Sequence, residues 1–175
     1  MAASEGAAGS SAAPVPRTGL APRSEHEAWM RMALAVAAEA AASSDVPVGA
    51  VVVDSEGAVR GLGHNVREAV HDPTGHAEVV ALRAAAADLG RWRLDGTVLV
   101  VTLEPCVMCT GAAVAARVDG IVFGAWDDKA GACGSVWDLP RDRASLHRPD
   151  VYAGILAHEC AALLTDFFAA NRAAD

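Results

Sequence analysis

The sequence predicts an α/β protein, a three-layer α/β/α sandwich around a mixed five-stranded sheet. Two observations favour this fold class. An early helix-forming segment is followed by two short β-branched runs that are separated by the turn-forming residues DSEG, and this pattern is typical of a hairpin. After the hairpin, helix-like and strand-like segments alternate, which favours a sheet covered by helices on both faces.

The first half of the chain predicts a helix, the hairpin and a second helix. The first helix is SEHEAWMRMALAVAAEA, in which Ser24 and Glu27 have the spacing of a capping box before apolar residues at helical intervals. The hairpin strands are VPVGAVVVD and AVRGLGHNV. The segment HAEVVALRAAAADLG is rich in alanine and leucine and ends at Gly90, which predicts a helix with a glycine C-cap.

The second half predicts three more strands and two more helices. TVLVVTL and GIVFGA have the composition of buried strands, and VMCTGAAVAAR forms a helix between them. A short strand is expected near Val151 to Ile155. The segment HECAALLTDFFAANR then closes the fold as a helix.

One domain is expected, with a tail before it. Residues 1–23 are mostly alanine, glycine, serine and proline, so they cannot bury enough apolar surface to offset the entropy of ordering, and we expect them to be disordered. Residues 24–175 are expected to form the domain, because a chain of 175 residues that is 53% hydrophobic supplies one sizeable core.

Composition also bears on location and partners. The sequence has no apolar run of the roughly 18 residues that a membrane span needs, and its first residues lack the basic n-region and the apolar h-region of a secretory signal. We therefore expect a cytoplasmic protein without a membrane partner. Cysteines there are mostly reduced, and a Cys-x-x-Cys pair then indicates metal binding or catalysis. The net charge of −8 disfavours an extensive basic face, although RDRASLHR (141–148) gathers three arginines and one histidine. That stretch fits a solvated loop and a phosphate-contacting segment equally well.

The segment TLEPCVMC (102–109) carries the chemistry. Cys106 and Cys109 lie where a predicted strand meets a predicted helix. A catalytic zinc ion takes three protein ligands and leaves the fourth position to water, and His76 at the start of the second predicted helix is the candidate third ligand. Glu78, two residues further on, would lie near the metal without ligating it. Both helix N-termini would favour the thiolates and this carboxylate through their dipoles.

These signals are weak singly and strong together. The order His-Ala-Glu, about thirty residues with one strand, then Pro-Cys-x-x-Cys is the signature of zinc-dependent nucleobase deaminases. A structural zinc site would instead be closed by a fourth protein ligand, for which His64 and His71 are the nearest candidates in the sequence.

From about Glu25 to Arg172 the chain resembles the bacterial tRNA-specific adenosine deaminases, the TadA family. The stretches that carry the resemblance are VPVGAVVV, Asn65 with HDPTGHAE, VTLEPCVMC, VFGAWDDKAGACGS and GILAHECAALLTDFF. The resemblance implies the cytidine-deaminase-like fold and a homodimer. It also implies conversion of adenosine to inosine at the wobble position of an arginine tRNA with anticodon ACG, with the anticodon stem-loop and not DNA as partner.

The resemblance also assigns roles to single residues. His76, Cys106 and Cys109 would hold one zinc ion per subunit, and Glu78 would move protons between water, the purine ring and the departing amine. The remaining positions are implied to bind substrate: Asn65 and the Ala77 amide would position the base, Val46 and Leu103 would line its pocket, Asp127 and Lys129 would lie near the anticodon loop, and His147, Phe168 and Arg172 would shape or contact the RNA. Val46 and Leu103 fit ordinary strand core equally well.

Three other functions remain open at this point. A deaminase of free bases or nucleosides, of the guanine or cytosine type, would share the fold and all four residues of the zinc site, but the segments after VFGA and in the closing helix resemble the tRNA enzymes. A non-catalytic zinc-stabilised RNA-binding module would not require Glu78. A redox Cys-x-x-Cys protein would require neither Glu78 nor His76.

Overall fold

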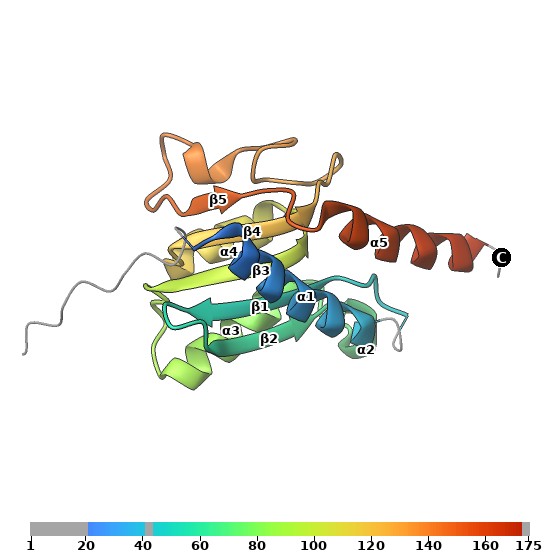
Figure 1. Ribbon diagram of the computed structural model, residues 1–175, viewed down its shortest axis with the longest axis horizontal. Coiled ribbons are helices and arrows are strands. Elements are labelled where there is room, and N and C mark those ends of the chain that lie inside the picture. The colour runs from blue at the N-terminus through green and yellow to red at the C-terminus, as the bar shows by residue number, and fades with distance from the viewer. Residues whose placement is uncertain (1–20, 41–43, 173–175) are drawn as a thin grey trace, which may run out of the picture.

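The computed structural model of the protein describes residues 21–40 and 44–172 (Figure 1). Most of the tail expected at residues 1–23 lies outside the described residues. Arg23 already belongs to the first helix, α1 (Arg23–Ala40).

A single five-stranded sheet forms the centre of the molecule. Its strands are β1 (Gly49–Asp54), β2 (Val59–His64), β3 (Thr97–Leu103), β4 (Gly120–Ala125) and β5 (Asp150–Tyr152). They lie in the order β2-β1-β3-β4-β5. β1 is antiparallel to both of its neighbours, whereas β3, β4 and β5 run parallel to one another. The predicted mixed sheet and its hairpin are thus confirmed.

Helices cover both faces of this sheet. α1 crosses one face, and α3 (Ala77–Leu89) and α4 (Val107–Ala116) lie on the other (Figure 1). The last helix, α5 (Ala157–Arg172), packs its first turns on the α1 side through Cys160 and then extends beyond the sheet. A short helix, α2 (Arg67–Val70), and a 3-10 turn at Leu139–Arg141 complete the fold. The three-layer sandwich is therefore confirmed.

The central strands are buried on both faces, so their side chains feed two separate cores. In β3, Leu99 and Val101 pack on the side of α3 and α4, while Val98 and Val100 pack on the side of α1. All four side chains are fully buried. A strand that is covered on both faces has no polar side, which explains why this segment reads as a continuous apolar run.

Glycines in β2 bring helix α3 unusually close to the sheet. A Cβ atom on Gly61 or Gly63 would collide with the backbone carbonyl oxygen of Ala81 or Ala77, respectively, in α3. Only glycine leaves room for the helix backbone at these two positions. The contact at Gly63 fixes the first residue of α3, and therefore the place where His76 leaves the loop.

Two sequence-based details were wrong or missing. Ser24 does not cap α1, because the helix begins one residue earlier and the N–H groups of Glu25 and His26 donate to the carbonyl oxygen of Pro22. Glu27 accordingly pairs with Arg23, at 3.2 Å, instead of closing a capping box. Helix α2 was not expected, since four residues are too few to show a helical period.

No helix within the described part of the chain combines the length and the apolar character that crossing a membrane requires.

We expect Gly63→Ala to lower the free energy of unfolding by about 1–3 kcal/mol, because the added methyl group forces α3 away from β2. Gly111 in α4 is the matched control, since a Cβ there meets no atom within 4 Å. Gly111→Ala should raise stability by about 0.5–1 kcal/mol. Urea unfolding at one protein concentration measures both, and an unchanged midpoint for Gly63→Ala would contradict the close approach.

Candidate metal centre and pocket

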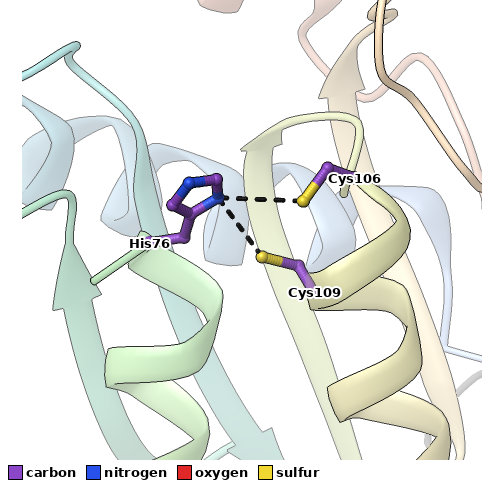
Figure 2. Close-up of side chains that lie close together, drawn as sticks. All are labelled: His76, Cys106 and Cys109. Atoms are coloured by element: carbon purple, nitrogen blue, oxygen red, sulfur yellow. Dashed lines mark hydrogen bonds between the residues drawn. The ribbon is translucent and has the colours of Figure 1, made fainter. Parts of the chain in front are cut away.

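Two helix N-termini meet at one edge of the sheet and carry the candidate metal ligands. His76 is the N-cap residue of α3 and Cys106 the N-cap residue of α4, both with extended backbone angles. Cys109 lies in the first turn of α4. Figure 2 shows the imidazole of His76 facing both cysteine side chains across the gap between the two helices.

The spacing of these three side chains suits a tetrahedral metal. The His76 Nδ1 atom lies 3.8 Å from Cys106 Sγ and 3.5 Å from Cys109 Sγ, and the three ligand atoms lie within 4.8 Å of one another. Tetrahedral zinc with ordinary Zn–N and Zn–S bond lengths separates a nitrogen from a sulfur ligand by about 3.6 Å. The three residues therefore form a site for one Zn²⁺.

Neither His64 nor His71 belongs to this cluster, which contains His76, Cys106 and Cys109 alone among the described residues. His64 instead lies 3.8 Å from the carboxylate of Glu39. Three protein ligands leave one tetrahedral position for a water molecule or a substrate, which is the arrangement of catalytic zinc sites.

Charge in the cluster also favours a cation. The hydrogen bond with Cys109 lowers the pKa of the Cys106 thiol to about 4, and the same bond raises the pKa of Cys109. A soft divalent cation binds cysteines as thiolates, and a Cys106 thiol with a lowered pKa supplies one readily.

Glu78 is a buried carboxyl group beside the cluster. It lies in the first turn of α3, and burial raises its pKa to about 7. A carboxyl group with a pKa near neutrality can both accept and release a proton under physiological conditions. Strong perturbation by desolvation is also characteristic of functional carboxylates.

A cavity of about 180 Å³ opens beside the cluster. Its walls combine the predicted residues Val46, Asn65, Leu103 and Asp127 with three of the four residues of the zinc site, and add Val48, Arg67, Glu104 and Ala130. The structure therefore brings the apolar residues Val46 and Leu103 and the polar residues Asn65 and Asp127 together around the metal centre.

Asn65 and the backbone of Ala77 form one unit. The Asn65 Oδ1 atom accepts a hydrogen bond from the Ala77 N–H at 2.9 Å, and Asn65 Nδ2 donates to the carbonyl oxygen of Val46 at 3.0 Å. These two partners fix the orientation of the amide. One Nδ2 hydrogen and one Oδ1 lone pair remain for a ligand, whereas the Ala77 N–H is already used.

The structure does not bring every predicted contact to the pocket. The ring nitrogen Nε2 of His147 donates to the carbonyl oxygen of Val118 at 2.6 Å, just before β4 and at the opposite end of the parallel strands from Cys106. Lys129 is exposed in the loop that follows Asp127. The RNA contacts expected from both residues stay predictions.

The C-terminal helix approaches the pocket through residues other than those predicted. A second cavity of about 220 Å³ shares Val46, Asn65 and Arg67 with the first, and Phe167 and Asn171 of α5 line it. The predicted residues Phe168 and Arg172 are exposed neighbours of these two. Their contacts with RNA stay predictions too.

Sequence reasoning missed Arg67 and Glu104. Arg67 lines both cavities, and Glu104 lies under the loop that carries Asp127. An arginine in a short polar segment carries no pattern of its own. The role of a glutamate two residues before a cysteine depends on partners about thirty residues away, which no local pattern indicates.

Known proteins resemble the chain over most of its length. The family model for the cytidine and deoxycytidylate deaminase zinc-binding region matches residues 23–125. The tRNA-specific adenosine deaminase of Bacillus subtilis is 40% identical over 144 residues, which cover 82% of this chain and 89% of that protein. A tRNA(Ile)-lysidine synthase of Deinococcus deserti is 51% identical over 139 residues, but this chain spans only 26% of its length.

Solved structures agree with these sequence comparisons. A chain from a study of A-to-I editing by tRNA:A34 deaminases at the wobble position is 39% identical, with a TM-score of 0.75, and the match covers 78% of this chain and 99% of that one. The guanine deaminase of Nitrosomonas europaea is 29% identical, with a TM-score of 0.69, over 82% and 84% of the two chains.

We expect the purified protein to contain about one zinc ion per chain and Cys106→Ser to contain almost none, because the remaining two ligands cannot hold the ion tightly. Cys160→Ser is the matched control, since Cys160 is a buried thiol of the other core. Elemental analysis after gel filtration measures both. Zinc retained by folded Cys106→Ser would remove Cys106 from the ligand set.

Proposed function

Because this chain belongs to the cytidine and deoxycytidylate deaminase family, and within it to the tRNA-specific adenosine deaminases, we propose that it converts adenosine to inosine at the wobble position of tRNA. One observation carries the proposal: the buried Glu78 lies beside a three-ligand zinc site in a chain that matches a tRNA-specific deaminase along most of both sequences. The substrate we propose is the anticodon stem-loop of an arginine tRNA with anticodon ACG. The enzyme would act in the cytoplasm, as a homodimer.

The reaction replaces the amine of adenosine by the oxygen of a water molecule and releases ammonia. His76, Cys106 and Cys109 would hold the zinc ion, which supplies a Lewis acid that lowers the pKa of a bound water toward neutrality. Glu78 takes a proton from the attacking water as the oxygen adds to the purine six-carbon. The carboxyl group then delivers this proton to the adjacent ring nitrogen.

Glu78 completes the cycle with a second proton. It removes the remaining hydroxyl proton from the tetrahedral carbon and gives it to the amine, which leaves as ammonia. The carboxylate is regenerated, and water plus adenosine has become inosine plus ammonia. Burial suits Glu78 to both steps, because it keeps the acid and base forms close in free energy.

The rest of the cavity would hold the base. Asn65 offers its free Nδ2 hydrogen and Oδ1 lone pair to polar atoms of the purine, and Val46 and Leu103 offer apolar walls to its faces. Extruding a base from the stack into such a pocket is how enzymes of this chemistry reach the reacting atom. Arg67 at the cavity wall would contact a backbone phosphate.

We expect wild-type protein to form inosine at the first anticodon position of an unmodified arginine tRNA transcript with anticodon ACG. Glu78→Gln should reduce kcat by about 10²–10⁴-fold or more, because it removes the group that moves both protons. Zinc content should remain one ion per chain, since Glu78 is not a ligand.

Sequencing of the reacted transcript and elemental analysis measure these two quantities. Zinc-loaded wild type that forms no inosine contradicts the tRNA assignment. Ammonia release from free guanine, cytosine or their nucleosides would then favour the deaminase class to which the Nitrosomonas europaea enzyme belongs.

Binding to the anticodon stem-loop should weaken steeply as salt rises, because phosphate contacts release counterions. Arg67→Gln should weaken binding and reduce the slope of log K against log salt by about 1. Arg93→Gln is the matched control, since Arg93 is paired with Asp95 at 2.8 Å just before β3, at the end of that strand remote from Cys106. An unchanged slope for Arg67→Gln would exclude Arg67 as a phosphate contact.

A further inference from the structure

A single buried carboxylate holds the loop that follows β4. Glu104 lies between the end of β3 and the metal ligand Cys106, and its side chain is 2% exposed. Its partners are backbone N–H groups of the loop. A buried charge of this kind is stable only when its oxygens are hydrogen-bonded, and each such bond is stronger than one between neutral groups.

Both carboxylate oxygens are used. Oε1 of Glu104 accepts hydrogen bonds from the N–H groups of Cys133, at 2.9 Å, and Ser135, at 3.1 Å. Oε2 accepts a hydrogen bond from the N–H of Asp127 at 3.2 Å. The carboxylate therefore joins the beginning of the loop to a point eight residues further along.

The loop is wrapped tightly around this group. A Cβ atom on Gly131 would collide with the carboxylate of Glu104. Next to Gly131, the N–H of Ala132 donates to the carbonyl oxygen of Pro105 at 2.8 Å, and Gly131 itself forms an isolated bridge with Cys106. The loop is thus attached to the same short segment that supplies a metal ligand.

This attachment decides where one wall of the cavity lies. Asp127 and Ala130 line the cavity on the β4 side, opposite Asn65, which follows β2. The carboxylate of Asp127 accepts the N–H groups of Lys129 and Ala130 at 3.0 and 3.2 Å, so the position of Ala130 depends on that of Asp127. The N–H of Asp127 in turn donates to Glu104, and its carbonyl oxygen accepts the Gly131 N–H at 3.0 Å and the Ser135 hydroxyl at 2.8 Å, both within the loop.

We propose that Glu104 is a positioning residue for the substrate: its carboxylate fixes the loop 127–135 relative to Cys106 and so sets the width of the cavity between the metal centre and the Asp127 wall. This inference rests on the proposed function and deepens it. Glu104 would not touch the base and would not transfer a proton. Its contribution would appear as substrate affinity, while the chemical step at the metal would be almost unchanged.

The decisive variant is Glu104→Gln. A glutamine in the same place can still present its carbonyl oxygen to Cys133 and Ser135, but its NH₂ group then faces the N–H of Asp127, and two donors cannot pair. The variant therefore breaks the hydrogen bond between Glu104 and Asp127 and keeps those from Cys133 and Ser135. Asp54→Asn is the matched control, because Asp54 accepts the N–H groups of Glu56 and Ala58 in the hairpin turn, away from the cavity.

We expect Glu104→Gln to raise KM for the anticodon stem-loop about tenfold, with kcat within about threefold of wild type and one zinc ion per chain. The lost charge-assisted hydrogen bond shapes the binding cavity, so its loss weakens binding of the substrate and of the transition state alike. Amide hydrogen exchange at Asp127 should become faster in the same variant. Asp54→Asn should change neither KM nor exchange at Asp127.

A double-mutant cycle tests whether Glu104 acts through Asp127. If it does, Asp127→Ala raises KM, and adding Glu104→Gln to that background raises KM no further. Fully additive effects would overturn the proposal, and so would an unchanged KM in Glu104→Gln. If Glu104→Gln does not fold, Glu104→Asp withdraws the carboxylate by one methylene and should show the same rise in KM, and an unchanged KM in Glu104→Asp would then overturn it.

These results separate the inference from the function on which it rests. A zinc-loaded wild type without inosine formation contradicts the proposed function. The exchange rate of the Asp127 amide in wild type and Glu104→Gln still tests the hold of Glu104 on the loop, and equal rates would refute that hold whatever the substrate is.

Discussion

The site depends on one constraint of the sheet: the strands that precede α3 and α4 point in the same direction. β1 is antiparallel to β2 on one side and to β3 on the other, so β2 and β3 both end at the edge where β1 begins. The helices that follow these two strands therefore start at that edge. His76 and Cys106, far apart in the sequence, become neighbours because each is the residue on which a helix starts. Glycines in β2 bring the first of these helices close enough for the two ends to share one ion.

Buried negative charge is the cost of this arrangement, and the structure offsets it in two ways. Around the metal site, two thiols and the carboxyl group of Glu78 crowd one imidazole; burial raises the pKa of Glu78, and the hydrogen bond with Cys106 raises that of Cys109. A divalent cation bound there would compensate the negative charge of these acidic groups. At Glu104 the charge is met by three peptide N–H groups instead. One buried acid is thus suited to proton transfer, while the other is suited to holding a fixed shape.

The sequence was most informative where the physics is local or periodic. The apolar run of β3, the glycine that ends α3 and the spacing from Cys106 to Cys109 each depend on a few neighbouring residues, and the structure agrees with all of them. The start of α1 was misplaced because Pro22 supplies the first acceptor, so no side-chain cap is needed. The bond between Asn65 and Ala77, and the whole environment of Glu104, join residues 12 to 31 positions apart. Such contacts exist only once the sheet has formed.

A shared fold does not by itself separate the tRNA enzyme from a deaminase of free bases. A guanine deaminase superposes almost as well as the tRNA:A34 deaminase chain, so the fold alone does not decide the substrate, and the walls of the cavity are where a difference can reside. In this chain those walls come from unlike sources: Asn65 is held by the backbone next to the metal ligand, whereas Asp127 belongs to a loop that is held by Glu104 and by backbone contacts with Pro105 and Cys106. The position of Asn65 is coupled to that of the metal ligand beside Ala77, so a substitution of Asn65 would also disturb the zinc site. The second wall contains no zinc ligand, and substrate choice is therefore more readily altered by side-chain changes in the loop than at the helix starts.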